Sequence, residues 1–165
     1  VGLGDVPFCA MNEDHVAGVG LAMAFPPIPI SRDMIDAGAH WDGYEAREQL
    51  SLLEGKSWTE LTPYILEHHA ALLIHCGSPL FRTILPAYLK LLVEGDYATM
   101  LPFHVISQLT SNPASEFDRK IFDERVGPLS AEQRAVVHRA LTMIAKQGVL
   151  RDVACAALPS WSEKR

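Results

Sequence analysis

The stretch from Trp58 to Leu92 constrains the fold most, because it is the longest region whose apolar residues follow helical spacing. Thr62–Pro63 and Ser78–Pro79 each place a proline at the start of a helix, where its missing N–H costs little. We therefore expect one helix over 63–75 and a second from 78 onward, separated by a break at Gly77. Pro86 lies deep in the second helix and is expected to kink or split it.

Capping patterns predict the other helices. Ser57 with Glu60, and Ser130 with Gln133, have the capping-box spacing that opens a helix. Three prolines in Phe25–Ile30 predict an extended strap, because residues that precede proline avoid the helical region. Further helices are expected over 12–25, 42–54, 97–109, 115–125, 130–147 and 150–158, with a short turn at 31–39.

These patterns together predict an all-α protein, since no segment alternates apolar and polar residues with period two. We expect a compact single-domain bundle of about seven helices, several of them kinked by proline. The 165 residues match the size of one domain. Residues 1–11 are expected to form an irregular N-terminal arm and residues 159–165 a polar C-terminal tail.

Charge and cysteine content exclude several classes of protein. The net charge is −6 and no lysine–arginine cluster is present, which argues against a nucleic-acid partner. No apolar run approaches the ~20 residues needed to cross a membrane. Three widely spaced cysteines without a CxxC pair favour a reducing compartment, so we expect a cytoplasmic protein.

Several short motifs resemble those of a family of small bacterial proteins known mainly as a domain of unknown function. The matching segments are Trp58-Thr-Glu60-Leu61, Phe81, Leu85-Pro86-Ala87-Tyr88-Leu89 and Leu129-Ser-Ala-Glu132-Gln133-Arg134. The resemblance covers roughly residues 41–144 and departs from the family pattern between Cys76 and Leu80. It implies a compact helical fold and supplies no activity.

The densest cluster of side chains suited to catalysis or metal binding is Glu67-His68-His69, followed by His75-Cys76. On one helix, His68 and His75 would lie ~10 Å apart along the axis, too far to share one metal ion. His68 and His69 would point about 100° apart. We therefore expect no metal and no cofactor. An enzyme site that combines His68, His69 or His75 with Glu67 or another carboxylate remains an alternative hypothesis.

The leading hypothesis is a non-enzymatic protein-binding domain, most specifically a bacterial immunity-type protein that neutralises a toxin. An acidic surface suits a basic partner. The segment from Asp33 to Glu48 is the expected interface, because acidic residues there surround two aromatic anchors. Its expected partner-binding residues are Asp33, Asp36, Trp41, Asp42, Tyr44, Glu45 and Glu48. A third hypothesis is a homodimer that buries the Leu85–Leu92 face.

Overall fold

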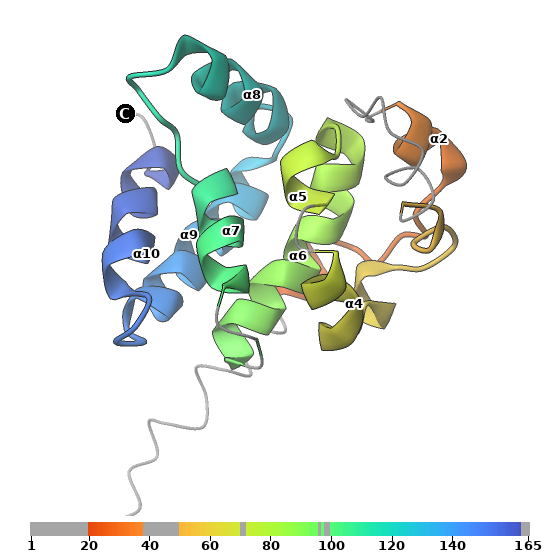
Figure 1. Ribbon diagram of the computed structural model, residues 1–165, viewed down its shortest axis with the longest axis horizontal. Helices are drawn as coiled ribbons and strands as arrows, with labels where there is room; N and C mark the ends of the chain where they lie inside the picture. Colours follow the sequence, from red (N-terminus) through yellow and green to blue (C-terminus); the bar gives the residue numbers. More distant parts are fainter. Residues whose placement is uncertain (1–19, 38–49, 70–71, 96, 98–99, 163–165) are drawn as a thin grey trace, which may run out of the picture.

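The computed structural model describes residues 20–37, 50–69, 72–95, 97 and 100–162. Within these ranges every regular element is helical, so the all-α prediction is confirmed. Helix α6 runs through the middle of the molecule, with α2 and α4 on one side and α7, α9 and α10 on the other, while α8 lies across one end (Figure 1). Helix α5 contacts both α6 and α7. The bounds are α2 Arg32–Asp36, α4 Pro63–His68, α5 Leu72–His75, α6 Ser78–Glu94, α7 Leu101–Gln108, α8 Glu116–Val126, α9 Ala131–Ala145 and α10 Arg151–Ala157. None of the described helices is both long and apolar enough to cross a membrane.

Helix α6 supplies the centre of the hydrophobic core. Phe81, Leu85, Leu89 and Leu92 have no exposed surface. Pro86 lies inside the helix without splitting it. The apolar side chains of the expected homodimer face at Leu85–Leu92 are buried in this core, and the homodimer itself stays a prediction.

The single helix expected over 63–75 is also corrected, because α4 ends at His68 and α5 begins at Leu72. The Tyr88 hydroxyl, from α6, lies 2.9 Å from the His69 carbonyl oxygen and 3.3 Å from that of Leu66. In a continuous helix both carbonyls would accept bonds from N–H groups four residues later. A tyrosine from a distant segment therefore takes part in ending this helix.

The predicted caps are confirmed. Ser57 and Glu60 form the capping box of a short 3-10 helix, η1 (Trp58–Glu60), and Ser130 with Gln133 does the same for α9. Gly95 ends α6 in the left-handed conformation, with φ of 74°. Local sequence determines these boundaries because each cap satisfies N–H or C=O groups that the helix itself leaves free.

The proline-rich strap over 25–30 has no regular secondary structure, as expected. It is fixed at both ends: the Trp58 indole N–H donates to the Phe25 carbonyl at 2.8 Å, and the Ile30 N–H donates to the Lys56 carbonyl at 2.9 Å. Ile30 is buried, with 1% of its surface exposed. The strap thus links the first described helical residues to the turn before η1.

Two predicted boundaries move. The helix expected over 42–54 is described only at its end, where helical structure stops at residue 51 and turns lead to Gly55. The predicted polar tail at 159–165 is wrong at its start, since a second 3-10 helix, η2 (Leu158–Trp161), carries Trp161 into the core. The Trp161 indole donates to the Leu109 carbonyl at 2.7 Å. The predicted arm over 1–11 lies outside the described residues.

Candidate functional site

A groove of about 990 Å³ opens between α8 and the pair α7 and α10, and residues of the turn between α5 and α6 also line it. Its walls are mostly apolar. Ile106 and Phe122 are buried in them, whereas Phe117 is 72% exposed at the edge. Phe103 and Ile74, each 37% exposed, continue the apolar surface on the other side. We refer to this feature as the α8 groove.

The helix expected over 115–125 carries three apolar side chains, Phe117, Ile121 and Phe122, and of these only Phe122 is buried. In the structure, the core contact of α8 is made by Phe122, Arg125 and Val126, at helical spacing i, i+3 and i+4. Phe117 and Ile121 extend that stripe along the groove instead. The fold therefore leaves a large aromatic side chain in solvent.

Helix α8 begins in a tightly hydrogen-bonded loop. The Ser115 hydroxyl accepts the Asp118 N–H at 3.2 Å, as a helix N-cap. The Asn112 side chain accepts the Ala114 N–H at 3.1 Å and donates to the Asp118 carboxylate, also at 3.1 Å. These bonds set the direction of α8, and with it the position of Phe117 at the edge of the groove.

Arg125 holds the other end of α8 in place. It is 5% exposed and donates to the Gln108 side-chain oxygen at 2.8 Å, the Ile74 carbonyl at 2.6 Å and the Cys76 carbonyl at 3.3 Å. Its guanidinium carbon lies 5.3 Å from the centre of the Phe81 ring. One side chain thus joins α8 to α7, to the end of α5 and to α6. Sequence reasoning missed Arg125, because an arginine among charged helix residues gives no local sign of burial.

The cysteine that lines the groove, Cys76, is poorly suited to act as a nucleophile. Burial raises the pKa of the Cys76 thiol to about 12, although the Arg125 charge opposes that shift. At neutral pH this cysteine is therefore a protonated thiol, whereas the nucleophile in cysteine catalysis is the thiolate. Burial also lowers the pKa of Arg125, but an arginine remains charged at neutral pH.

The structure does not bring the predicted catalytic residues to the groove. His68 is exposed, stacks on Tyr64 with 3.9 Å between ring centres, and bonds through Nδ1 to the Tyr64 carbonyl. His69 is half-buried, and its Nδ1 is buried without a partner in the described structure. Neither of them, nor Glu67, is among the described residues that line the groove. The side chain of His75 lies outside the described part. No three His, Cys, Asp or Glu side chains in the described ranges gather closely enough to hold a metal ion.

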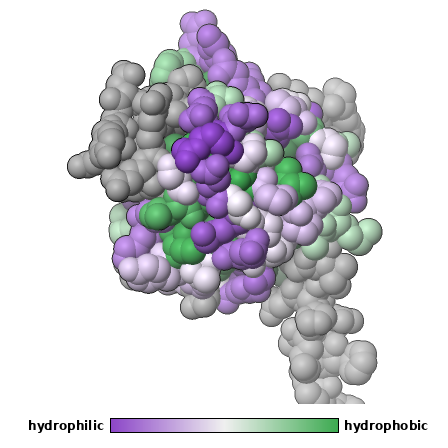
Figure 2. Space-filling model, turned by 90° about the vertical axis from the view of Figure 1, so that its right-hand side faces the viewer, coloured by the Kyte–Doolittle hydropathy of each residue, from purple (hydrophilic) through white to green (hydrophobic). Residues whose placement is uncertain are grey.

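The predicted partner-binding segment is described only in part. Asp33 and Asp36 are exposed on α2. The other five expected residues, Trp41, Asp42, Tyr44, Glu45 and Glu48, lie outside the described residues. Figure 2 shows the side of the molecule that carries α2 and α4, where hydrophilic atoms predominate at the centre and hydrophobic patches are separate.

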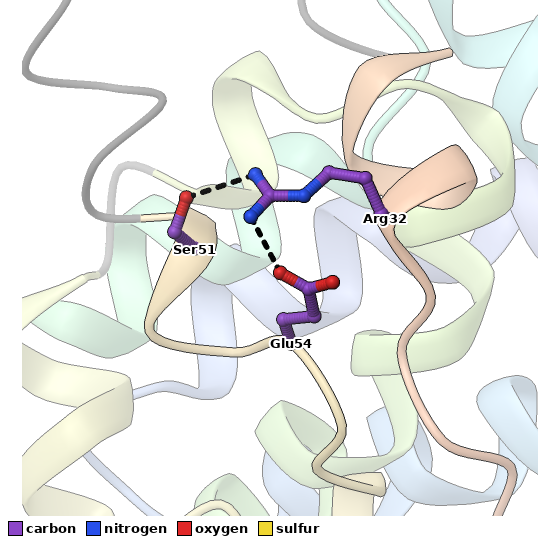
Figure 3. Close-up of polar contacts among 3 residues, drawn as sticks. All are labelled: Arg32, Ser51 and Glu54. Atoms are coloured by element: carbon purple, nitrogen blue, oxygen red, sulfur yellow. Dashed lines mark hydrogen bonds and ion pairs between the residues drawn. The ribbon is translucent and has the colours of Figure 1, made fainter.

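The position of α2 is set by Arg32. Its guanidinium forms an ion pair of 2.6 Å with Glu54 and a hydrogen bond of 3.1 Å with Ser51 (Figure 3). Both charged side chains are substantially exposed, so this pair contributes at most about 1 kcal/mol to stability. Arg32 on α2 is thus paired with Glu54. The carboxylates of Asp33 and Asp36 have no ion-pair partner among the described residues.

Comparison of the sequence and the structure with known proteins identifies no similar protein. No family model matches the chain, no curated protein is significantly similar in sequence, and no solved structure is significantly similar in fold. The site is therefore interpreted from its own geometry.

Proposed function

We propose that this protein is a non-enzymatic protein-binding domain, and that a partner protein inserts apolar side chains into the α8 groove. The observation that carries this proposal is the exposure of Phe117, at 72%, beside a large apolar groove. A contiguous apolar surface bordered by polar residues is typical of an interaction site. Grooves between helices commonly receive the apolar face of a partner helix.

The position of Phe117 supports this role. The described core packs without it, and the Ser115 N-cap together with the hydrogen bond from Asn112 to the Asp118 carboxylate holds its helix in one direction. An aromatic residue presented on a capped helix loses little conformational freedom when a partner covers it. Phe103 and Ile74, across the groove, provide further apolar surface for the same partner segment.

Charge supports a basic partner. The net charge of −6 favours fast association with a positively charged protein. The carboxylates of Asp118 and Glu124 lie in the lining of the groove, and those of Asp33 and Asp36 are exposed on α2. In its sharpest form, the proposal is an immunity-type protein that neutralises a basic toxin in the bacterial cytoplasm. The segment from Asp33 to Glu48 would then be a second contact region.

The experiment is to co-express the chain with the product of the adjacent gene, purify the complex, and measure its dissociation constant by calorimetry. Phe117→Ser is expected to weaken binding at least tenfold, because burying a phenylalanine contributes about 1.5–3 kcal/mol. Val149→Ser is the matched control, since Val149 is 86% exposed and is not among the residues that line the groove. Absence of a complex with the wild-type protein, or equal affinities of both variants, would contradict the proposal.

A further inference from the structure

One end of the α8 groove, called here the Arg125 end, carries a buried positive charge. Arg125 is 95% buried there, since 5% of its surface is exposed, and Gly77, the N-cap of α6, and Ser78, its first residue, also line the groove. All three oxygen atoms that Arg125 contacts belong to neutral groups: two backbone carbonyls and the Gln108 amide. No carboxylate pairs with this guanidinium in the described part of the chain. A buried cation is normally paired, because burial in an apolar environment penalises an isolated charge.

Arg125 retains unused hydrogen-bond donors. A guanidinium has five N–H groups. One Nη1 hydrogen is used by Gln108, and the two Nη2 hydrogens are used by Ile74 and Cys76. The Nε hydrogen and the second Nη1 hydrogen therefore have no acceptor among the described residues. These two donors belong to a side chain that lines the groove and forms no ion pair there, although the negative charge of Glu124, which also lines the groove, acts on it.

Two features of α6 add to this preference for an anion. The helix has 17 residues, and its N-cap, Gly77, provides no side-chain acceptor for the free N–H groups. The N-terminus of a helix carries partial positive charge and attracts anions. The Ser78 hydroxyl oxygen is buried and has no hydrogen-bond partner among the described residues. The guanidinium, the helix N-terminus and the hydroxyl group thus all belong to residues that line the groove.

From this arrangement we propose that the Arg125 end of the groove is a carboxylate subsite, occupied by an acidic side chain that the partner carries within its apolar segment. This inference rests on the proposed function and specifies the chemistry of the partner. A carboxylate fits because it is planar, singly charged and able to accept two N–H bonds from a guanidinium. The apolar walls then hold the side chains that flank it.

The subsite can be tested without the partner, using 4-phenylbutanoate and 4-phenylbutan-1-ol, which share one apolar body and differ in charge. Titration of the ¹⁵N-labelled protein is expected to show at least about tenfold tighter binding of the carboxylate, as for charge-assisted hydrogen bonds. The amide signal of Ser78 should shift with the carboxylate. Equal binding of the two probes, binding of neither, or shifts outside the groove would overturn the proposal.

Two variants test whether Arg125 and Ser78 cause the preference for the carboxylate over the alcohol. Arg125→Gln should remove the preference for the carboxylate; circular dichroism checks that its fold is retained. Ser78→Ala removes a hydroxyl that makes no hydrogen bond in the described structure, so it should fold normally. It should weaken the carboxylate about threefold and leave the alcohol unchanged. Unchanged affinity for the carboxylate in both variants would contradict the assignment.

The outcomes separate this proposal from the function on which it rests. If the probes bind equally while partner binding depends on Phe117, the protein-binding function stands and the subsite is wrong. If the carboxylate is preferred but no partner complex forms, the assignment to a partner side chain is wrong. Both proposals hold only if Ser78→Ala also weakens binding of the partner protein by about threefold.

Discussion

Replacing Arg125 with methionine tests whether this residue fixes α8 to the rest of the protein. The substitution keeps an apolar side chain of similar length but removes all three hydrogen bonds. Cys76 is 1% exposed, so its carbonyl would be left without this donor inside the fold, at a cost of about 1–3 kcal/mol. Loss of the contact with Phe81 adds about 1 kcal/mol. Ile74 and Gln108 line the groove, so their freed oxygens can be hydrated instead.

Removing a buried charge also returns part of its desolvation penalty, so the expected net loss in unfolding free energy is about 2 kcal/mol. For a protein of this size that loss corresponds to a decrease in melting temperature of about 4–8 °C. The assay is urea denaturation followed by circular dichroism. Arg119→Met, on the exposed side of the same helix, is the control and should change stability by less than about 0.5 kcal/mol. A loss for Arg125→Met below about 1 kcal/mol would refute the account of Arg125 as the residue that holds α8.

Three further predictions follow from buried groups. Burial, together with the charge of His68, lowers the pKa of His69 from its ordinary value of 6.5. The unfolded chain therefore binds a proton at His69 more readily than the folded protein, and the free energy of unfolding should fall as the pH drops below about 6.5. His69→Gln should reduce that decline, and an unchanged pH profile would contradict the prediction. Iodoacetamide at pH 8 should modify exposed Cys155 well before buried Cys76, whose thiol pKa is about 12; mass spectrometry showing equal rates would count against the described burial. Trp58→Phe should cost about 1–2 kcal/mol by removing the indole bond to Phe25, measured by urea denaturation, and a neutral effect would show that the strap is held by other contacts.

Local signals in the sequence predicted most helix boundaries. The capping boxes at Ser57 and Ser130, the N-cap at Ser115 and the glycine after α6 act within a few residues of where they lie. Such signals can be read from one sequence because both partners of each hydrogen bond are close in the chain. The break between α4 and α5 could not be read in this way, since the Tyr88 hydroxyl that bonds there comes from 19 residues beyond His69.

The candidate site was harder to predict for the same reason. The groove forms where α5, α7, α8 and α10 meet, and its key residue, Arg125, reaches carbonyls 49 and 51 residues away. The sequence predicts the helix that carries Phe117, but it does not show that the buried face of this helix, at Phe122, Arg125 and Val126, excludes Phe117. The histidine cluster suggested a site because its members are adjacent in sequence. In the structure, His68 bonds to the Tyr64 carbonyl of its own helix, and His69 is half-buried.

The most direct test of the central claim, that the α8 groove receives the partner, is hydrogen–deuterium exchange of the purified complex against the free protein. The account predicts that slower exchange on binding is strongest in α7 and α8, residues 101–126, which form the groove walls. Protection of residues 33–48 alone, with α7 and α8 unchanged, would place the partner on the acidic segment and contradict the groove as the binding site.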